Sequence, residues 1–100
     1  MRAKELLTEG PMWNAIKRTF RKLLNFGADR YQYNKAAVKS LEDGMMKLTK
    51  IDYDSIDQLM KFISKQAKIS PQKLHDLFVQ KHGVIPDKWI EEKRKKWHQI

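Results

Sequence analysis

Apolar residues recur at intervals of three and four along most of the chain, which is the spacing of amphipathic helices. The first such segment begins near Pro11, a residue suited to the first turn of a helix, and ends at Gly27, which suits the position just past one. Its apolar stripe consists of Trp13, Ile16, Phe20, Leu23 and Leu24. We therefore expect a helix that buries this stripe and leaves its other side polar.

A second helix is predicted from Asp29, a residue typical of helix N-caps, to Gly44. Its expected apolar contacts come from Tyr31, Ala37, Val38 and Leu41. The next stretch, residues 45–54 (MMKLTKIDYD), mixes β-formers with polar residues. This pattern leaves three interpretations open: a short strand, a continued helix or a linker.

Three further helices are predicted in the C-terminal half. Ser55 and Gln58 have the spacing of a capping box and open the first of them. The pair Ser70–Pro71 opens the next, which ends at Gly83, and the last follows Pro86. The residues expected to be buried are Ile56, Leu59, Met60, Ile63, Leu74, Leu77, Phe78, Trp89, Ile90 and Trp97.

These elements predict an all-α fold, a small bundle of four to five short helices whose last three form a C-terminal tri-helical unit. A chain of 100 residues has the length of one domain with one modest core. No internal repeat or Gly/Ser-rich linker divides it. We expect a single basic helical domain over residues 11–100, preceded by an N-terminal arm or leader over residues 1–10.

Composition adds a strong charge imbalance to this picture. The chain has 21 Lys and Arg against 12 Asp and Glu, a formal net charge of +9. Self-repulsion of that size is tolerated more easily beside an anionic partner, so nucleic acid is the leading candidate and an acidic protein the alternative. The absence of cysteine excludes a disulfide framework and a thiolate metal site. No apolar run reaches the roughly 18 residues of a spanning helix, and we expect no membrane partner.

The cations gather in two clusters. They are Lys17, Arg18, Arg21 and Lys22 on the first predicted helix, and Lys93, Arg94, Lys95 and Lys96 on the last. Each cluster is either a contact for a nucleic-acid backbone or another polyanion, or a solvated face that keeps the protein soluble. The net charge favours the first interpretation. In the second cluster, Glu91 and Glu92 are spaced to pair within the helix with Lys95 and Lys96.

Catalytic motifs are absent from the sequence. His75, His82 and His98 are scattered, and no Gly-x-Ser-x-Gly turn or phosphate-binding glycine loop is present. His75 and His82 are about two helical turns apart but have no third ligand, which disfavours a metal site. We therefore predict no enzyme activity, no cofactor, no metal and no small-molecule substrate.

The sequence allows two further interpretations. The last two helices, with Gly83 between them, suggest a helix-turn-helix, but Asp87 and Glu91 at the start of the last helix would face phosphate unfavourably. Trp13 and Phe20 would suit a membrane surface beneath a cationic rim, or the core of the bundle. We favour the core for these two aromatic residues.

The first ten residues, MRAKELLTEG, contain the triplet Leu7-Thr8-Glu9 directly before Gly10. This segment resembles the short leader of the internal head proteins of T-even-like bacteriophages, whose prohead protease cuts after Leu-x-Glu or Ile-x-Glu. The resemblance implies processing after Glu9, and the remaining body would keep a charge of +9, from 19 basic minus 10 acidic residues. A second triplet, Ile90-Glu91-Glu92, stands inside a predicted helix.

The first hypothesis is therefore a small basic phage-encoded protein that associates without sequence specificity with DNA or the virion interior, and is delivered with the genome. It implies a location in the virion interior or the host cytoplasm. The alternative is an inhibitor or adaptor that docks a basic surface on an acidic host or phage protein. A helix-turn-helix regulator is the third hypothesis, and the oligomeric state stays open.

Overall fold

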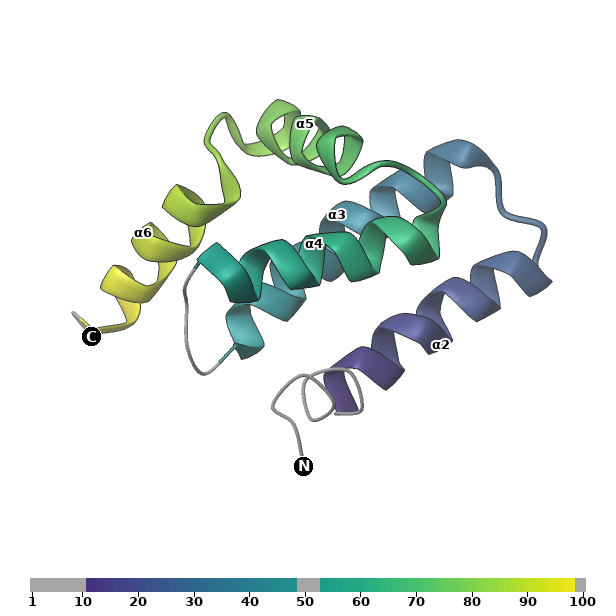
Figure 1. The fold of residues 1–100 in the computed structure, drawn as a ribbon, viewed down its shortest axis with the longest axis horizontal. Helices are drawn as coiled ribbons and strands as arrows, with labels where there is room; N and C mark the ends of the chain where they lie inside the picture. The colour runs from purple at the N-terminus through teal and green to yellow at the C-terminus, as the bar shows by residue number, and fades with distance from the viewer. Residues whose placement is uncertain (1–10, 49–52, 99–100) are drawn as a thin grey trace.

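The computed structural model describes residues 11–48 and 53–98 (Figure 1). Within these ranges the chain forms five helices and no strand: α2 (Pro11–Asn25), α3 (Arg30–Lys47), α4 (Tyr53–Ala67), α5 (Pro71–His82) and α6 (Pro86–His98). The predicted all-α small bundle is confirmed. The predicted leader, with its candidate processing site at Leu7, Glu9 and Gly10, lies outside the described residues.

Two predicted helix ends are confirmed by their backbone geometry. Gly27 has a φ of 67°, and the amides of Gly27 and Ala28 donate to the carbonyls of Leu24 and Leu23, which closes α2 in a Schellman motif. At the start of α5, the Ser70 hydroxyl accepts from a first-turn amide 3.1 Å away. Both helix ends therefore lie at the capping residues that the sequence predicts.

The boundaries between α3 and α4 differ from the prediction. Asp29 caps α3 in a reciprocal capping box with Gln32, as its residue type suggested. However, α3 continues through Gly44 to Lys47, so the predicted end at Gly44 is wrong. Helix α4 begins at Tyr53, two residues before the predicted N-cap at Ser55. Residues 45–47 therefore continue a helix and residues 53 and 54 start the next one.

Gly44 lies inside α3 at a point where a side chain of the neighbouring helix approaches the backbone closely. A Cβ placed at Gly44 would lie 2.9 Å from Cδ2 of Leu59, which is fully buried in α4. A glycine costs about 1 kcal/mol relative to alanine in a helix interior. Here that cost is offset by the close approach of α3 and α4.

Replacing Gly44 with alanine should lower the free energy of unfolding by about 1 kcal/mol, because overpacking against Leu59 outweighs the gain in helix propensity. Urea denaturation monitored by circular dichroism measures this change. Asp43→Ala, at the adjacent exposed position of the same helix, is the control and should not destabilise. A stabilised Gly44→Ala variant would contradict the close packing.

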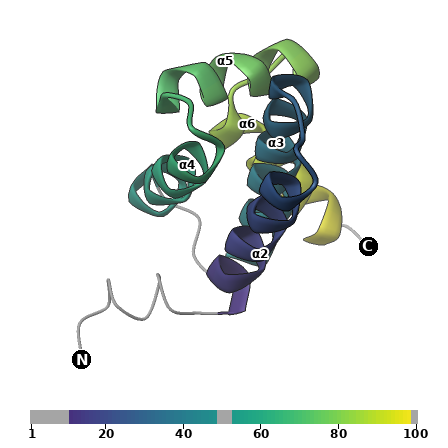
Figure 2. The ribbon, with the colours of Figure 1, turned by 90° about the vertical axis from the view of Figure 1, so that its right-hand side faces the viewer.

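The core lies around α3 and α4, which run side by side at the centre of the molecule (Figures 1 and 2). Helices α2 and α5 each pack on both of them, and α6 packs on α4 and α5. The predicted C-terminal unit of α4, α5 and α6 therefore forms, but α3 also packs against two of its helices. Trp13 and Phe20 are each 3% exposed, which confirms their interpretation as core residues. The other buried hydrophobic residues are Ile16, Ala37, Val38, Leu41, Met45, Leu48, Ile56, Leu59, Met60, Ile63, Ala67, Leu74, Phe78 and Ile90.

A polar junction joins α3 to the end of α5. The carboxylate of Glu42 lies 2.8 Å from Nζ of Lys81 and 2.8 Å from Nε2 of His82. The His82 ring packs against Phe78 and Trp89, with ring centroids 4.4 and 5.2 Å away, and these two rings also contact each other. Burial raises the pKa of Glu42, but the hydrogen bonds from Lys81 and His82 outweigh it and hold this pKa below its usual 4.5.

This junction predicts a pH-dependent stability. The pKa of Glu42 is lower in the folded than in the unfolded protein. The ionised carboxylate therefore adds to the free energy of unfolding above pH 4.5, and this stabilisation is lost as the pH falls through the pKa of the folded state. Glu42→Gln should cost about 1 kcal/mol at neutral pH, and the difference from wild type should shrink below pH 4.5. Urea titrations across this range measure it, with Asp43→Asn as control. A constant difference at all pH values would contradict the assignment.

Candidate functional site

Helix α2 carries four exposed cations beside and opposite the residues that it buries, and Leu24 of the predicted apolar stripe is exposed. Lys17, Arg18, Arg21 and Lys22 are all exposed, and the helix contains no Asp or Glu. The same helix buries Trp13, Ile16 and Phe20 against the rest of the bundle. The amphipathic pattern thus fixes both the orientation of α2 and the direction in which its cations point.

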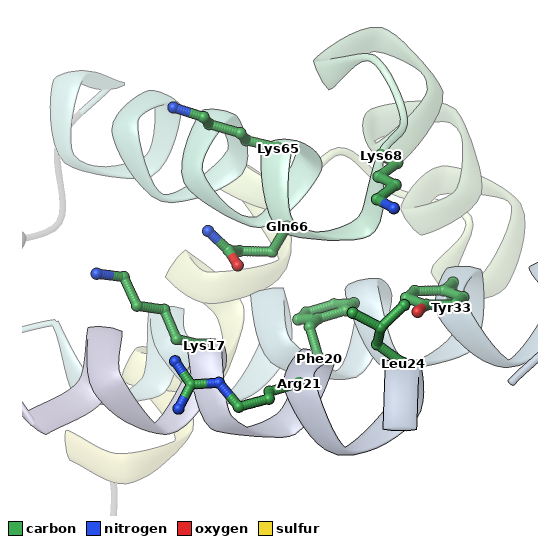
Figure 3. Close-up of a pocket in the computed structure, with 8 residues that line it drawn as sticks. All are labelled: Lys17, Phe20, Arg21, Leu24, Tyr33, Lys65, Gln66 and Lys68. Atoms are coloured by element: carbon green, nitrogen blue, oxygen red, sulfur yellow. The ribbon is translucent and has the colours of Figure 1, made fainter. Parts of the chain in front are cut away.

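Two of these cations line an open cleft between α2 and the end of α4. The cleft has a volume of about 410 Å³. Its lining residues are Lys17, Phe20, Arg21, Leu24, Tyr33, Lys65, Gln66 and Lys68. Half of this lining is cationic and none of it is acidic. In Figure 3, Lys17 and Arg21 extend from α2, and Gln66 points toward them from α4. Lys68, just past the end of α4, lies above Leu24 and Tyr33, and Lys65 lies further out on α4.

Aromatic rings form the floor of the cleft. Phe20 and Tyr33 stack with centroids 6.1 Å apart and an angle of 18° between their planes (Figure 3). Nearby, the ammonium of Lys17 lies 5.9 Å from the ring centroid of Phe62, and that ring packs edge-on against Trp13. These contacts connect Lys17 and the aromatic floor of the cleft to the packed core of the bundle.

The end of α4 brings Lys68 to the cleft in an unfavourable backbone conformation. Lys68 has a φ of 61°, the left-handed position that follows a helix and that glycine usually occupies. Its amide donates to the carbonyl of Lys65, and the amide of Ile69 donates to that of Ser64 at 3.0 Å. A residue with a Cβ costs about 1 to 2 kcal/mol in this conformation.

Arg30, at the start of α3, neutralises the negative end of α4. Its guanidinium donates to the carbonyl of Ala67 at 2.6 Å and lies 5.4 Å over the ring of Tyr33. The last carbonyls of a helix carry a partial negative charge that would otherwise offset nearby cations. Arg30 therefore caps a carbonyl at the end of α4, directly before Lys68.

Lys65 and Lys68 were not among the site residues predicted from the sequence. Lys61, Lys65 and Lys68 recur at intervals of four and three, which is the signal of a basic stripe on one helix face. Lys61 is paired with Asp57 at 2.9 Å, whereas the two cleft lysines have no ion pair with a described carboxylate. Only the packing of α2 beside α4 shows that two distant segments form one site.

The second predicted cluster lies elsewhere and is partly used within the fold. Lys93 lies 5.6 Å over the ring of Trp89, and Arg94 donates to the carbonyl of Leu48, the residue that caps the end of α3. Lys95 is exposed, and the side chain of Lys96 is outside the described part of the structure. Since α6 packs on α4 and α5 while α2 packs on α3 and α4, the structure does not bring the two clusters together.

Neither the sequence nor the fold matches a known protein family, a curated protein or a solved structure. Function therefore has to be inferred from the chemistry of the site itself. Within residues 11–48 and 53–98, no three His, Cys, Asp or Glu side chains are placed to hold a metal ion. Over the same ranges, none of the helices has both the length and the apolar character needed to cross a membrane.

A second groove differs from the cleft in its charge. It lies between α3 and α5, has a volume of about 430 Å³, and is lined in part by Tyr31, Val38 and Leu77. Of its two cations, Lys35 and Lys81, the latter is already paired with a carboxylate. The α2–α4 cleft therefore concentrates more unpaired charge, and we treat it as the candidate functional site.

Proposed function

We propose that the protein binds nucleic acid through its phosphate backbone at the α2–α4 cleft, without reading base sequence. The observation that carries this proposal is the lining of the cleft: four cations, from α2, from α4 and from the turn that follows α4, and no carboxylate. Arg and Lys are the residues that neutralise phosphates in such interfaces, and phosphate contacts supply most of the sequence-independent affinity.

The electrostatics of the cleft supports this proposal. Lys17, Arg21, Lys65 and Lys68 form no ion pair with any described carboxylate. A cleft lined by one sign of charge between low-dielectric walls focuses its field and raises the local concentration of the opposite charge. The net charge of +9 strengthens the attraction at long range.

Sequence-specific reading through α5 and α6 receives less support. The first turns of α6 carry Asp87 and Glu91. The pKa of Asp87 is raised from its ordinary value, mainly by burial. The charge of His75 lowers this pKa, and the charge of Glu91 raises it. An acidic, partly buried first turn is poorly suited to approach phosphates or base edges. The helix-turn-helix hypothesis thus remains the weaker prediction.

Fluorescence anisotropy with a labelled oligonucleotide of mixed sequence tests the proposal. Four phosphate contacts predict a log–log dependence of affinity on salt with a slope of about −3 to −4. Changing the base sequence should leave the affinity within about threefold, because phosphates carry no sequence information. No binding at about 50 mM salt would contradict the proposal and favour the alternative, a basic surface that docks on an acidic protein.

The phage setting extends this proposal to a protein packaged beside DNA in a virion and delivered with it. Its support is the leader-like segment that ends in Glu9 and the excess of positive charge in the remaining body. Co-expression with a T-even-like prohead protease, followed by intact-mass spectrometry, should show a cut after Glu9. An intact Glu9–Gly10 bond would remove the leader from the proposal and leave the cleft unaffected.

A further inference from the structure

The lining of the cleft offers hydrogen-bond acceptors as well as donors. Its four cationic side chains can only donate, and they therefore match phosphate oxygens, which only accept. Two other lining residues have a side chain that can accept: the amide of Gln66 and the hydroxyl of Tyr33. The cleft can therefore bind a hydrogen-bond donor on the ligand in addition to its phosphates.

Gln66 is the acceptor that the structure directs at the two cations of α2. Its half-buried side chain points from α4 toward Lys17 and Arg21, whereas Tyr33 lies beneath Lys68 (Figure 3). Within residues 11–48 and 53–98, no other residue forms a hydrogen bond with the side-chain amide of Gln66. A ligand bound to Lys17 and Arg21 thus meets an acceptor that the fold does not use.

The backbones of the two nucleic acids differ in the donors that they present. The phosphates and deoxyriboses within a DNA strand have acceptor oxygens and no donor, whereas each ribose of RNA carries a 2′-hydroxyl that can donate. A protein that contacts only the backbone can distinguish RNA from DNA through this hydroxyl. An acceptor among phosphate-binding cations therefore favours RNA.

We propose that the α2–α4 cleft binds RNA in preference to DNA, with the amide oxygen of Gln66 accepting from a 2′-hydroxyl while Lys17 and Arg21 bind neighbouring phosphates. This inference rests on the proposed function, names the sugar that the bound backbone carries, and does not depend on the phage setting. The cations supply an affinity that is common to both nucleic acids. Gln66 supplies the difference between them.

Anisotropy titrations of the full chain with three labelled oligonucleotides of one mixed sequence and about 12 nucleotides test the inference. They are a DNA, the corresponding RNA, and an RNA in which fluorine, which has no proton to donate, replaces each 2′-hydroxyl. The RNA should bind about fivefold more tightly than the DNA, which is the net effect of one added hydrogen bond. The fluorinated RNA should bind like the DNA.

Gln66→Met keeps the length of the side chain and removes its amide. This variant should bind RNA only as tightly as DNA, and its affinity for DNA should stay within about twofold of wild type, because the cations are unchanged. Gln80→Met, at an exposed position of α5 outside the cleft, is the matched control and should keep the preference for RNA. Circular dichroism spectra and melting temperatures verify that both variants fold.

The outcomes separate this inference from the proposed function. Equal affinities of the wild type for RNA and DNA, or fluorinated RNA that binds as tightly as RNA, would overturn the inference and leave phosphate binding in place. A Gln66→Met variant that keeps the preference, or that loses affinity for RNA and DNA alike, would also overturn it. Binding of none of the three oligonucleotides at about 50 mM salt would overturn both proposals.

Discussion

Replacing Lys17 and Arg21 together by alanine is expected to weaken binding of an oligonucleotide by about 30- to 100-fold at low salt. Both side chains line the same wall of the cleft, and neither is paired with a described carboxylate. Each charge-assisted contact with a phosphate contributes about 1 to 1.5 kcal/mol, and every 1.4 kcal/mol corresponds to a tenfold change in affinity. Anisotropy titrations with wild type and variant measure the ratio.

The matched control removes the same net charge from another part of the surface. Lys73 on α5 and Lys88 on α6 are exposed and do not line the cleft. The double variant Lys73→Ala/Lys88→Ala should weaken binding by less than about threefold, through long-range electrostatics alone. Equal losses in the two double variants would show that overall charge, and not the cleft, determines binding.

Replacing Lys68 with glycine is expected to change stability and binding in opposite directions. Glycine relieves the left-handed strain at this position, so the free energy of unfolding should rise by about 1 kcal/mol and the melting temperature by about 4–8 °C. The same change removes one of the four cations from the cleft, so affinity should fall about fivefold. Thermal melts and anisotropy titrations give the two values.

A second substitution separates the two effects at Lys68. Lys68→Gln removes the charge but keeps a side chain in the left-handed conformation, so it should lose affinity like Lys68→Gly without becoming more stable. Wild-type affinity in Lys68→Gly would show that this lysine has no part in binding. The strained backbone would then have no functional counterpart.

Local signals predicted most of the fold. Capping and left-handed backbone geometry depend only on neighbouring residues, so the sequence predicts the helix ends that they form. These ends lie at Asp29, Ser70–Pro71, Gly27 and Gly83. The prediction that a helix ends at Gly44 is wrong. The glycine at this position is explained by a close contact with Leu59 on another helix. Such a contact has no local sequence signature.

Only half of the candidate site could be predicted from the sequence. The basic face of α2 follows from its periodicity, and Lys17 and Arg21 were identified from it. Lys68 belongs to a segment more than forty residues away, and it becomes part of the site only because α2 packs beside the end of α4. Arg94 has the same charge as the others, but tertiary structure places its side chain against the carbonyl of Leu48.

The location of binding is the central claim, and amide chemical-shift mapping tests it most directly. Titration of the ¹⁵N-labelled chain with an oligothymidine should shift the amides of residues 17–24 and 65–68 most strongly, in a manner that rising salt reverses. Residues 93–95 of α6 should shift little. Larger changes along α6 than along α2, or small changes spread evenly over all exposed lysines, would contradict a binding site in the α2–α4 cleft.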